Sequence, residues 1–328
     1  MVDRLHILVV HIDSNLPSFV KKDIDLLSKN HDVRPIAYRS RRDVMQILTG
    51  TLWADVTISW FAWDQAAWAV RFSKLFRRKS IVVVGGFDVV NMPEISYGNL
   101  LSPTNAARTR YAIKNASKVI AISQSLKTDA VRFSGRKDIE IINLGFDATE
   151  FTPNGHKEPI ALTVGAVTKL TMKRKGIETF IKAAQYAPDI EFHLIGVINR
   201  ELEDKLRASA TPNLKILGRV DQIRLLEEMR RAAVYVQVSA HEGFGCSLAE
   251  AMLCGCVPIV SDRGAIPEVV GDAGFYAKLW DAEGVGKLVL KALGRPDLGT
   301  VARDRISRLF PLEKRERLLM KIVNELLK

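Results

Sequence analysis

Two glutamates and two glycines lie close together in the segment 234–276, and their types suit a charged sugar compound. Glu242 and Glu250 stand eight positions apart, with Gly243 and Gly245 between them. A carboxylate only accepts hydrogen bonds, so each glutamate can take both hydroxyls of a vicinal diol. Glycines let a backbone approach a ligand closely, and the free N–H groups at a helix start attract phosphate. A pyrophosphate flanked by two sugar rings would suit this segment.

A strand, a helix and a second strand must position these residues. The apolar run 234–238 predicts a strand buried on both faces, and HEGFG predicts the turn that follows it. CSLAEAML predicts a helix that Gly255 ends, so the amides near Gly245, Cys246 and Ser247 would face the phosphates. CVPIVS then predicts the next buried strand.

Each glutamate also has a purely structural interpretation. Ser247-Leu-Ala-Glu250 fits a capping box, in which Glu250 only bonds back to the start of its own helix. Glu242 would then be an ordinary solvated charge in a loop. The local pattern alone leaves both alternatives open.

With both glutamates in register, the segment resembles the E-x7-E region of retaining glycosyltransferases of the GT-B fold, specifically family 4. The resemblance rests on Glu242, Phe244, Gly245 and Glu250, and on the Pro-Glu pair at 267–268. It implies that Glu250 holds the donor ribose and that Glu242 contacts the transferred sugar near its reacting face. It also implies main-chain contacts from Phe244 and Gly245.

A basic segment, TKLTMKRKG, follows the first strand expected in the second half of the chain. Its cations are Lys169, Lys173, Arg174 and Lys175. Such a cluster would neutralise the charge of a leaving diphosphate, whereas a basic loop on its own is more often solvated charge. In the family, a basic residue and a lysine six positions later, just before a glycine, hold the diphosphate. Lys169 and Lys175 have that offset, although lysine replaces the usual arginine at 169.

Two further loops acquire roles through the resemblance. The main chain of Gly218, Arg219 and Val220 would border the nucleotide base, with a simple glycine turn as the alternative. The first loop, residues 13–20, would face the acceptor. There Pro17 and Ser18 stand where the family usually has two glycines, so the acceptor contact is a weak expectation.

The strand expected near residue 80 ends in a departure from the family pattern. Gly85 stands where the family commonly carries a cleft histidine, and Gly86 and Asp88 follow. The departure puts a histidine-assisted role in doubt. Retaining enzymes of this family need no general base to activate a displaced water, so transfer is still expected. Asp88 would bind an acceptor hydroxyl or, as the alternative, cap a turn.

Two basic segments in the first half suit anionic partners. RSRRD at 39–43 would face acceptor phosphates or lipid headgroups, or be a solvated loop. The segment 66–80 predicts a basic amphipathic helix, with Trp68, Phe72 and Leu75 at helical spacing. Such helices lie on membrane surfaces, but apolar stripes of this kind pack in cores more often.

Length and patterning predict two domains. A chain of 328 residues exceeds the size at which one core usually stays single, and strands alternate with helices throughout, which favours α/β units with parallel sheets. The resemblance implies the GT-B arrangement, two Rossmann-like domains facing across a cleft. We expect an acceptor domain at 1–152, a nucleotide-sugar domain at 153–305 and a helix at 306–328 that crosses back to the first domain.

Charge and cysteine content narrow the partners. The formal net charge of +11 favours nucleotide sugars, polyphosphates or an anionic membrane, and no recognised module supports nucleic acid. Cys246, Cys254 and Cys256 are odd in number and match no zinc spacing, so reduced, packed thiols are expected. No apolar run is long enough to span a membrane and no signal peptide is apparent, so we expect a cytoplasmic protein, with peripheral contact at the inner membrane face left open.

The sequence therefore predicts transfer of a sugar from a nucleotide-diphosphate sugar to an acceptor hydroxyl of unknown identity, with retention and without a metal or other cofactor. Glu242 and Lys175 would act at the reacting centre. A non-catalytic nucleotide-sugar sensor or assembly subunit of the same fold is the main alternative. A Rossmann dehydrogenase is disfavoured, because no G-x-G-x-x-G follows the first strand.

Overall fold

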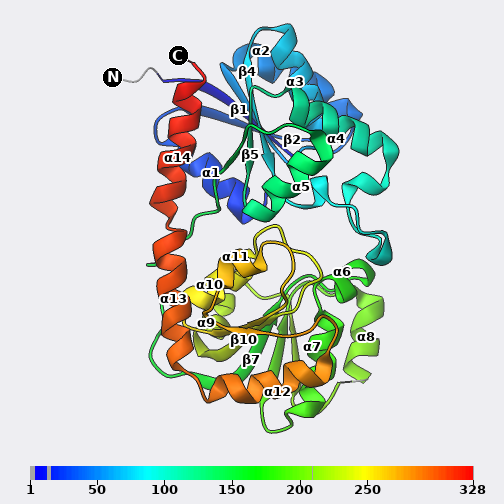
Figure 1. Ribbon diagram of the computed structural model, residues 1–328, viewed down its shortest axis with the longest axis vertical. Coiled ribbons are helices and arrows are strands. Elements are labelled where there is room, and N and C mark those ends of the chain that lie inside the picture. Colours follow the sequence, from blue (N-terminus) through cyan, green and yellow to red (C-terminus); the bar gives the residue numbers. More distant parts are fainter. Residues whose placement is uncertain (1–3, 13–15, 209, 328) are drawn as a thin grey trace. The chain divides into compact units, whose positions relative to one another are not determined.

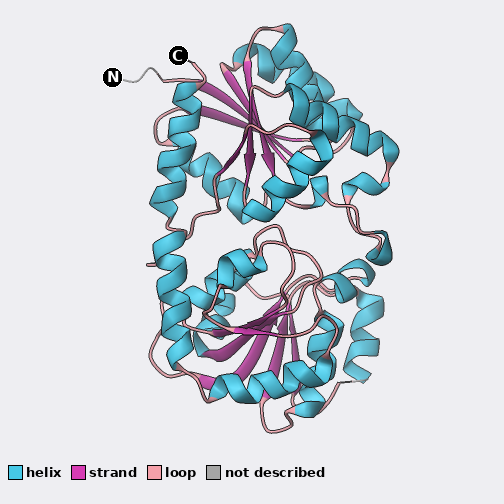
Figure 2. Cartoon of the chain, viewed as in Figure 1, coloured by secondary structure: helices cyan, strands magenta, loops and turns pink. Residues whose placement is uncertain are grey.

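The chain forms two compact units, each built on one six-stranded parallel sheet with helices around it (Figures 1 and 2). The structure is a computed structural model that describes residues 4–12, 16–208 and 210–327. The first unit comprises residues up to 145 together with those from 312 onward, and the second comprises 146–311. Residues 13–15, part of the first loop predicted to face the acceptor, lie outside the described residues.

The sheet of the first unit has the strand order β2-β1-β3-β4-β5-β6. Its strands are β1 (His6–His11), β2 (Asp32–Ala37), β3 (Val56–Trp60), β4 (Lys79–Val84), β5 (Lys118–Ala121) and β6 (Ile139–Ile141). Its helices are α1 (Ser18–Ser28), α2 (Val44–Trp53), α3 (Asp64–Leu75), α4 (Pro103–Asn115), α5 (Gln124–Ser134) and α14 (Leu312–Glu325). The central strands read as continuous apolar runs because helices cover both faces of a parallel sheet.

The last helix, α14, is held in the first unit by a buried ion pair. Arg315 contacts Asp23 of α1 through two 2.6 Å hydrogen bonds, and both side chains are almost fully buried. Arg315 also donates to the carbonyls of Ile142 and Asn143. The helix begins at Leu312 rather than at 306, because proline at 311 cannot continue the helix before it.

The second unit begins at Phe146 rather than at 153. The ring of Phe146 stacks on Phe244, 5.7 Å between centroids, and its N–H donates to the carbonyl of Phe310 at 2.9 Å. Phe244 packs edge-on against Phe310. These three aromatic residues attach the segment after β6 to the second core.

The sheet of the second unit has the strand order β12-β11-β10-β7-β8-β9. Its strands are β7 (Glu158–Val164), β8 (Glu191–Ile195), β9 (Leu214–Gly218), β10 (Ala232–Gln237), β11 (Val257–Val260) and β12 (Phe275–Tyr276). Its helices are α6 (Lys169–Arg174), α7 (Ile177–Ala183), α8 (Arg200–Ala208), α9 (Gln222–Arg231), α10 (Cys246–Leu253), α11 (Ile266–Val270), α12 (Ala282–Leu293) and α13 (Asp297–Leu309).

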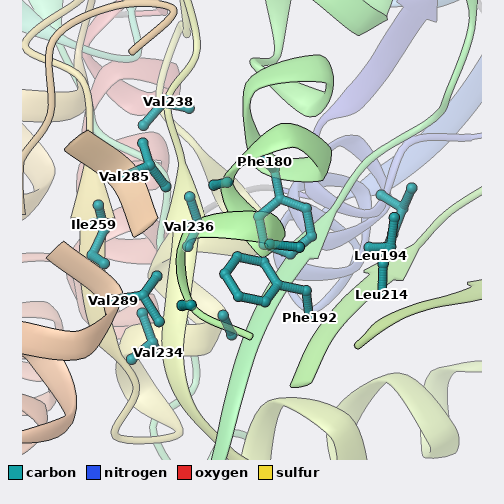
Figure 3. Close-up of a cluster of buried hydrophobic side chains, with 14 of the residues drawn as sticks. Phe180, Phe192, Leu194, Leu214, Val234, Val236, Val238, Ile259, Val285 and Val289 are labelled. Carbon is teal, nitrogen blue, oxygen red and sulfur yellow. The ribbon is translucent and has the colours of Figure 1, made fainter. Parts of the chain in front are cut away.

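The core of the second unit lies between this sheet and the helices α7 and α12. Phe180 of α7 packs on Phe192 of β8 with ring centroids 5.1 Å apart, and Val285 and Val289 of α12 approach the other strands (Figure 3). All four side chains are buried. This packing fixes the strands whose loops carry the candidate site.

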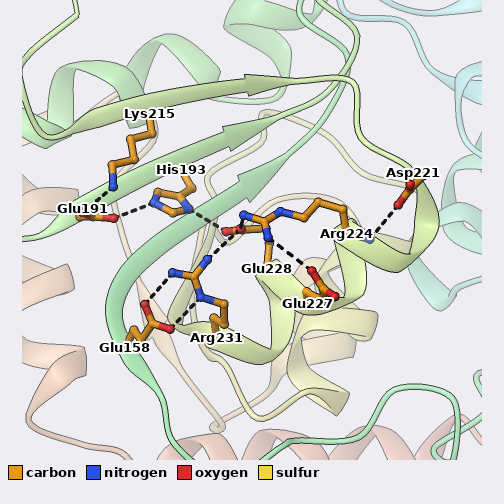
Figure 4. A network of polar contacts seen from close by, with 9 residues as sticks. All are labelled: Glu158, Glu191, His193, Lys215, Asp221, Arg224, Glu227, Glu228 and Arg231. Atoms are coloured by element: carbon orange, nitrogen blue, oxygen red, sulfur yellow. Dashed lines mark hydrogen bonds and ion pairs between the residues drawn. The ribbon is translucent and has the colours of Figure 1, made fainter.

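A saturated network of charges ties α9 to the sheet (Figure 4). Glu228 is fully buried, and one carboxylate oxygen lies 2.7 Å from Nδ1 of His193 on β8. The other lies 2.5 Å from Arg224 and 3.0 Å from Arg231. The second ring nitrogen of His193 contacts Glu191 at 2.9 Å. Burial acts to raise the pKa of Glu228, but the contact with His193 and the two guanidinium groups outweigh it, and its pKa is lowered.

The predicted amphipathic helix is α3, and most of its apolar stripe packs inside the first unit. Trp68 and Phe72 stack at 5.8 Å and pack against a cluster that contains Leu8 and Val10. Leu75 remains 68% exposed. Core packing therefore explains the stripe, apart from Leu75. None of the helices in the described part of the chain is sufficiently long and apolar to cross a bilayer.

The cysteines are free thiols, as expected from their number. Cys254 and Cys256 are fully buried, and burial raises the pKa of the Cys254 thiol to about 12. Both thiols are therefore packed core groups.

Candidate functional site

The predicted strand, glycine turn and helix form β10, the loop 238–245 and α10. Gly245 is the N-cap of α10 with φ 98°, a left-handed conformation that side chains rarely adopt. The helix begins at Cys246, which is partly exposed. The first amides of a helix have no partner within it, so the segment Cys246–Ser247 presents N–H groups beside the loop.

The capping box predicted as an alternative for Glu250 does not form. Because the N-cap is Gly245, Ser247 occupies the second helical position, and no side chain caps the helix. Glu250 lies one turn further on and is partly buried. Glu250 is therefore not the partner of Ser247 in a capping box.

The charges of both glutamates act on Tyr235 of β10, which sequence reasoning did not place in the site. Its side chain is fully buried. Burial raises the pKa of its hydroxyl, and the nearby charges of Glu250 and Glu242 raise it further, against a hydrogen bond with Ser247. The hydroxyl therefore stays neutral, and it donates a hydrogen bond to Oε1 of Gln237 at 3.4 Å. A tyrosine among valines in a buried strand was the only signal in the sequence.

Glu242 lies beside two cations, at distances longer than those of hydrogen bonds. Its Oε1 is 3.8 Å from Arg174 and 4.0 Å from Lys175, and it accepts a hydrogen bond from the hydroxyl of Ser239 at 3.1 Å. The Glu242 side chain is 13% exposed and that of Lys175 is 28% exposed. The carboxylate is therefore mostly shielded from solvent, although its ion pairs are long.

The neighbouring backbone fixes Glu242 from the side of β11. The N–H of Ala265 donates to the Glu242 carbonyl at 3.0 Å. Gly264 has φ 58°, and a Cβ added there would lie 2.4 Å from that carbonyl oxygen. Glycine at 264 is thus needed for this close approach.

The basic segment is a short helix rather than the predicted loop. Thr168 and Thr171 form a reciprocal capping box that starts α6 at Lys169. At its other end the Arg174 carbonyl accepts the N–H of Ala240 at 2.6 Å. Gly176 has φ 68°, and a Cβ there would lie 2.4 Å from the carbonyl oxygen of Val238. The end of α6 is therefore joined to the loop after β10.

Lys175 follows α6 and leans on the turn after β7. A Cβ at Gly165 would lie 3.0 Å from Cδ of Lys175, so glycine at 165 makes space for the lysine stem. Arg174 also approaches Glu242. The sequence placed Arg174 in the basic cluster but did not assign it to the site, because the family offset selects only Lys169 and Lys175.

Lys169 has different surroundings. It begins α6, its side chain is 81% exposed, and its ammonium lies 4.0 Å from Glu201 of α8. Six helical positions are 600° of rotation at 100° per residue, so Lys169 and Lys175 project from different sides of α6. The described contacts bring Lys175, not Lys169, to Glu242.

The main chain predicted to border the base ends the edge strand β9. Gly218 has φ 69° and its carbonyl accepts the N–H of Gly196 at 2.9 Å, while Arg219 is exposed. In the strand order, β9 lies three positions from β10, roughly 14 Å at the usual strand spacing. The alternative interpretation as a glycine turn therefore accounts for Gly218. The residues up to Val220 follow the carboxyl end of β9, and Glu242 likewise follows the carboxyl end of β10.

All these loops leave the carboxyl ends of parallel strands at one edge of the sheet. The chain runs from β7 outward to β9 and then returns to place β10 on the other side of β7. Gly165 follows β7 and Glu242 follows β10, so both lie at the point where strand order reverses. Ligands of open α/β sheets bind at such switch points.

The predicted acceptor-side residues lie in the first unit. Pro17 is the N-cap of α1 and Ser18 its exposed first residue. Asp88 is 1% exposed and accepts the amides of Ala62 and Gly86 at 2.8 Å. Burial raises the pKa of Asp88, against these amide contacts. Asp88 therefore forms the turn cap, because its carboxylate is enclosed by backbone donors.

Gly86 and the glycine before it are fixed by conformation and space. Gly86 has φ 135°. A Cβ at Gly85 would lie 2.4 Å from the ring of Phe61. The aromatic ring thus occupies the space that a side chain at 85 would need.

Comparison with known proteins agrees with this architecture. Residues 158–295 match the family model of glycosyl transferases group 1. HepE from Anabaena, solved with UDP-glucose, superposes with a TM-score of 0.81 at 18% identity, covering 98% of this chain and 100% of that one. The sucrose-phosphate synthase of Thermosynechococcus elongatus gives a TM-score of 0.78 at 18% identity, with 98% and 99% covered.

Curated relatives are similar over part of their length. Alpha-maltose-1-phosphate synthase of Mycobacterium tuberculosis is 26% identical over 61% of this chain and 60% of its own length. Phosphatidyl-myo-inositol mannosyltransferase of Mycolicibacterium smegmatis is 31% identical over 58% of this chain and 52% of its own. Residues 158–295 thus match the model of that family, and the chain has the GT-B fold. The fold class predicted from the sequence is confirmed, and the assignment to family 4 stays a prediction.

Proposed function

We propose that the chain is a glycosyltransferase that moves a sugar from a nucleotide-diphosphate sugar to an acceptor hydroxyl, with retention and without a metal. The second unit binds the donor and the first binds the acceptor. The observation that carries the proposal is the placement of Glu242 beside Lys175 and Arg174 at the switch point, next to the start of α10. The family match over this unit and the names of its relatives support the same reaction class.

Each group at this site has a role in the proposed transfer. The bond from the anomeric carbon to the diphosphate breaks, so negative charge develops on the diphosphate. The acceptor oxygen bonds to that carbon, and its proton passes to the departing diphosphate oxygen. Lys175, Arg174 and the amides at Cys246 and Ser247 stabilise that charge. The 3.8–4.0 Å separations leave Glu242 able to accept sugar hydroxyls without losing its neighbours.

Glu250 binds the ribose, and the stretch Gly218–Val220 borders the base. The ribose role follows the family resemblance, and Glu250 stands one turn into α10, close to the helix start that would face the phosphates. Lys169 is left out of the donor site, since it is exposed and faces Glu201. The protein acts in the cytoplasm, and contact with an anionic membrane remains a prediction from its net charge of +11.

A panel of UDP, GDP, ADP and their sugars tests the proposal. A ligand at a hundred times its dissociation constant stabilises the folded state by about 2.7 kcal/mol, so one nucleotide should raise the unfolding temperature clearly above the others. The matching sugar nucleotide should then be hydrolysed slowly with water as acceptor, and proton NMR would give the anomer. Binding without turnover would favour the non-catalytic sensor. Failure of every nucleotide to bind would refute the proposed function.

A further inference from the structure

A pocket lies wholly in the first unit, at the carboxyl ends of its strands. Its volume is about 330 Å³. Ile12 lines it directly after β1, Tyr38 directly after β2 and Trp63 shortly after β3. The strand order β2-β1-β3 reverses between β1 and β3, so this pocket occupies the switch point of the first sheet. It is the position corresponding to that of Glu242 in the second unit.

Positive charge dominates the pocket. Three arginines line it, Arg39, Arg41 and Arg108, against one carboxylate, that of Asp64. Asp64 is paired with Arg108, whose Nε lies 3.2 Å from Oδ1. Among the described residues, Arg39 and Arg41 have no ion-pair partner for their guanidinium groups. The residues that line the pocket thus carry a net positive charge, while Asp43, outside the lining, also acts on Arg39.

The chain Tyr38–Asp64–Arg108 is fixed in place. The Tyr38 hydroxyl donates to Oδ2 of Asp64 at 2.5 Å, and the Tyr38 side chain is buried. Burial, with the contact to Asp64, raises the pKa of Tyr38, so the hydroxyl stays protonated and donates. A guanidinium has five N–H donors, and the contact to Asp64 uses that of Nε, which leaves the terminal Nη groups of Arg108 for a ligand.

Arg39 and Arg41 are exposed, as the solvated alternative for residues 39–43 predicts, but they sit on a turn with defined hydrogen bonds. Ser40 and Asp43 form a capping box, and the Asp43 carboxylate accepts the N–H groups of Arg39 at 2.8 Å and Ser40 at 2.9 Å. These backbone hydrogen bonds lower the pKa of Asp43. The turn therefore holds Arg39 and Arg41 on either side of Ser40, at the mouth of the pocket.

Trp63 adds a flat apolar wall. It is partly exposed, and its ring packs edge-on against Phe87 with centroids 6.0 Å apart. An indole face suits the apolar face of a sugar or cyclitol ring, while its neighbour Asp64 retains lone pairs for a hydroxyl. The lining therefore combines anion donors with a surface for a polyol.

We propose that this pocket binds the acceptor and that the acceptor is a polyol bearing a phosphate group. Planar guanidinium groups bind phosphate through paired hydrogen bonds, which explains three arginines around one small cavity. That the ligand is the acceptor rests on the proposed function, whereas binding of a phosphate-bearing polyol at this pocket does not. The phosphate-bearing polyol is either a soluble sugar phosphate or the headgroup of a phospholipid, which share this chemistry.

Direct binding to the full chain, with and without UDP, tests the pocket separately from catalysis. The soluble probes are glucose 1-phosphate and glucose, followed by calorimetry. The membrane probes are vesicles of phosphatidylinositol and of phosphatidylcholine, followed by sedimentation. The variant is Arg39→Gln with Arg41→Gln, and the matched control is Arg42→Gln, an exposed neighbour that does not line the pocket.

We expect one phosphate-bearing probe to bind at least about tenfold more tightly than its control probe, and the double variant to lose about tenfold of that affinity. Arg42→Gln should bind as the wild type does. Selectivity for glucose 1-phosphate identifies a soluble acceptor, and selectivity for phosphatidylinositol vesicles identifies a lipid. Equal binding by the double variant and the wild type, or no preference for phosphate in either arm, overturns the inference. Phosphate binding at the pocket without any binding of UDP, GDP or ADP would instead refute the proposed function and leave the pocket intact.

Discussion

The second unit contains two clusters in which basic residues surround a glutamate, and the clusters differ in how closely the charges approach and how deeply the glutamate is buried. Around Glu228, a histidine and two arginines lie 2.5–3.0 Å from one fully buried carboxylate. Around Glu242, an arginine and a lysine lie 3.8 and 4.0 Å from a carboxylate that keeps some exposure. The first cluster joins α9 to the sheet away from any glycine loop. The second lies among turns shaped by glycines at 165, 176, 245 and 264.

The difference distinguishes charges that stabilise the fold, around Glu228, from charges that we propose bind the donor, around Glu242. A buried carboxylate is stable only when its partners satisfy it, and Glu228 is satisfied. The charged residues near Glu242 are positioned by backbone hydrogen bonds instead, such as that from the N–H of Ala240 to the carbonyl of Arg174. Their charged groups do not come within hydrogen-bond distance of the Glu242 carboxylate. Substitutions in the first cluster should therefore lower stability, and substitutions in the second should lower ligand binding or rate.

Removal of the buried carboxylate should have the largest effect. Glu228→Ala removes the common partner of His193, Arg224 and Arg231. Breaking a fully buried pair costs about 3–5 kcal/mol, and the loss here should be smaller because both arginines are partly exposed and keep Glu227 and Glu158 as partners. Urea denaturation would measure the loss. Glu227→Ala is the control, because its contact with Arg224 is half exposed and worth about 1 kcal/mol or less. Similar losses in the two variants would show that the network does not stabilise the unit.

Removal of the lysine at the candidate site should lower the rate and leave the fold intact. Lys175→Ala removes one cation from the developing diphosphate charge, and loss of one such group costs about a hundredfold to a thousandfold in rate. Donor turnover and urea denaturation measured together would separate the two effects. A variant that unfolds at much lower urea but turns over donor normally would place Lys175 with the structural charges.

Glu250→Ala should weaken nucleotide binding about tenfold, because a hydrogen bond to a charged group is worth about 1.5–3 kcal/mol. The loss should be equal for the nucleoside and the nucleoside diphosphate, since both carry the ribose. Lys175→Ala should affect only the diphosphate, so each variant serves as control for the other. Calorimetric affinities that do not change in Glu250→Ala would remove this residue from the ribose site.

Much of the fold was predictable because buried parallel strands are continuous apolar runs in the sequence. The runs before Gly165 and Glu242 are of this kind and became β7 and β10. The boundary between the two units was harder to predict from the sequence. Phe146 joins the second unit through Phe244 and Phe310, and contacts between residues so distant in sequence leave no local pattern.

The candidate site was predictable where spacing or glycine specified it. Glu242 and Lys175 lie side by side in the structure, whereas their chemical roles stay predictions. Arg174 and Tyr235 were missed because their approach to the glutamates depends on where α6 ends and which face of β10 points inward. The capping box failed for a local reason, since the left-handed Gly245 starts the helix before Ser247.

Acid should destabilise the protein through the saturated cluster. Contacts with Lys215 and then His193 lower the pKa of Glu191, and the pKa of Glu228 is also lowered. Carboxylates with a lowered folded pKa stabilise the fold above their ordinary pKa of 4.5, and this stability is lost as pH falls through the folded pKa. The free energy of unfolding of Glu228→Gln should fall less steeply below pH 4.5 than that of wild type. A Glu227→Gln control with the same flattened profile would contradict this origin.

Lys169→Ala should have the smallest effect and gives the sharpest test between sequence spacing and structure. The family offset pairs Lys169 with Lys175, but its ammonium is exposed and 4.0 Å from the equally exposed Glu201. An exposed pair of this kind contributes about 0–1 kcal/mol, so stability should change by about 1 kcal/mol or less and donor affinity by about fivefold or less. Calorimetry with the nucleoside diphosphate identified by the panel would measure the affinity beside Lys175→Ala. If Lys169→Ala loses as much affinity as Lys175→Ala, then α6 must reorient when the donor binds, and the separation of Lys169 from Glu242 would describe only the unliganded chain.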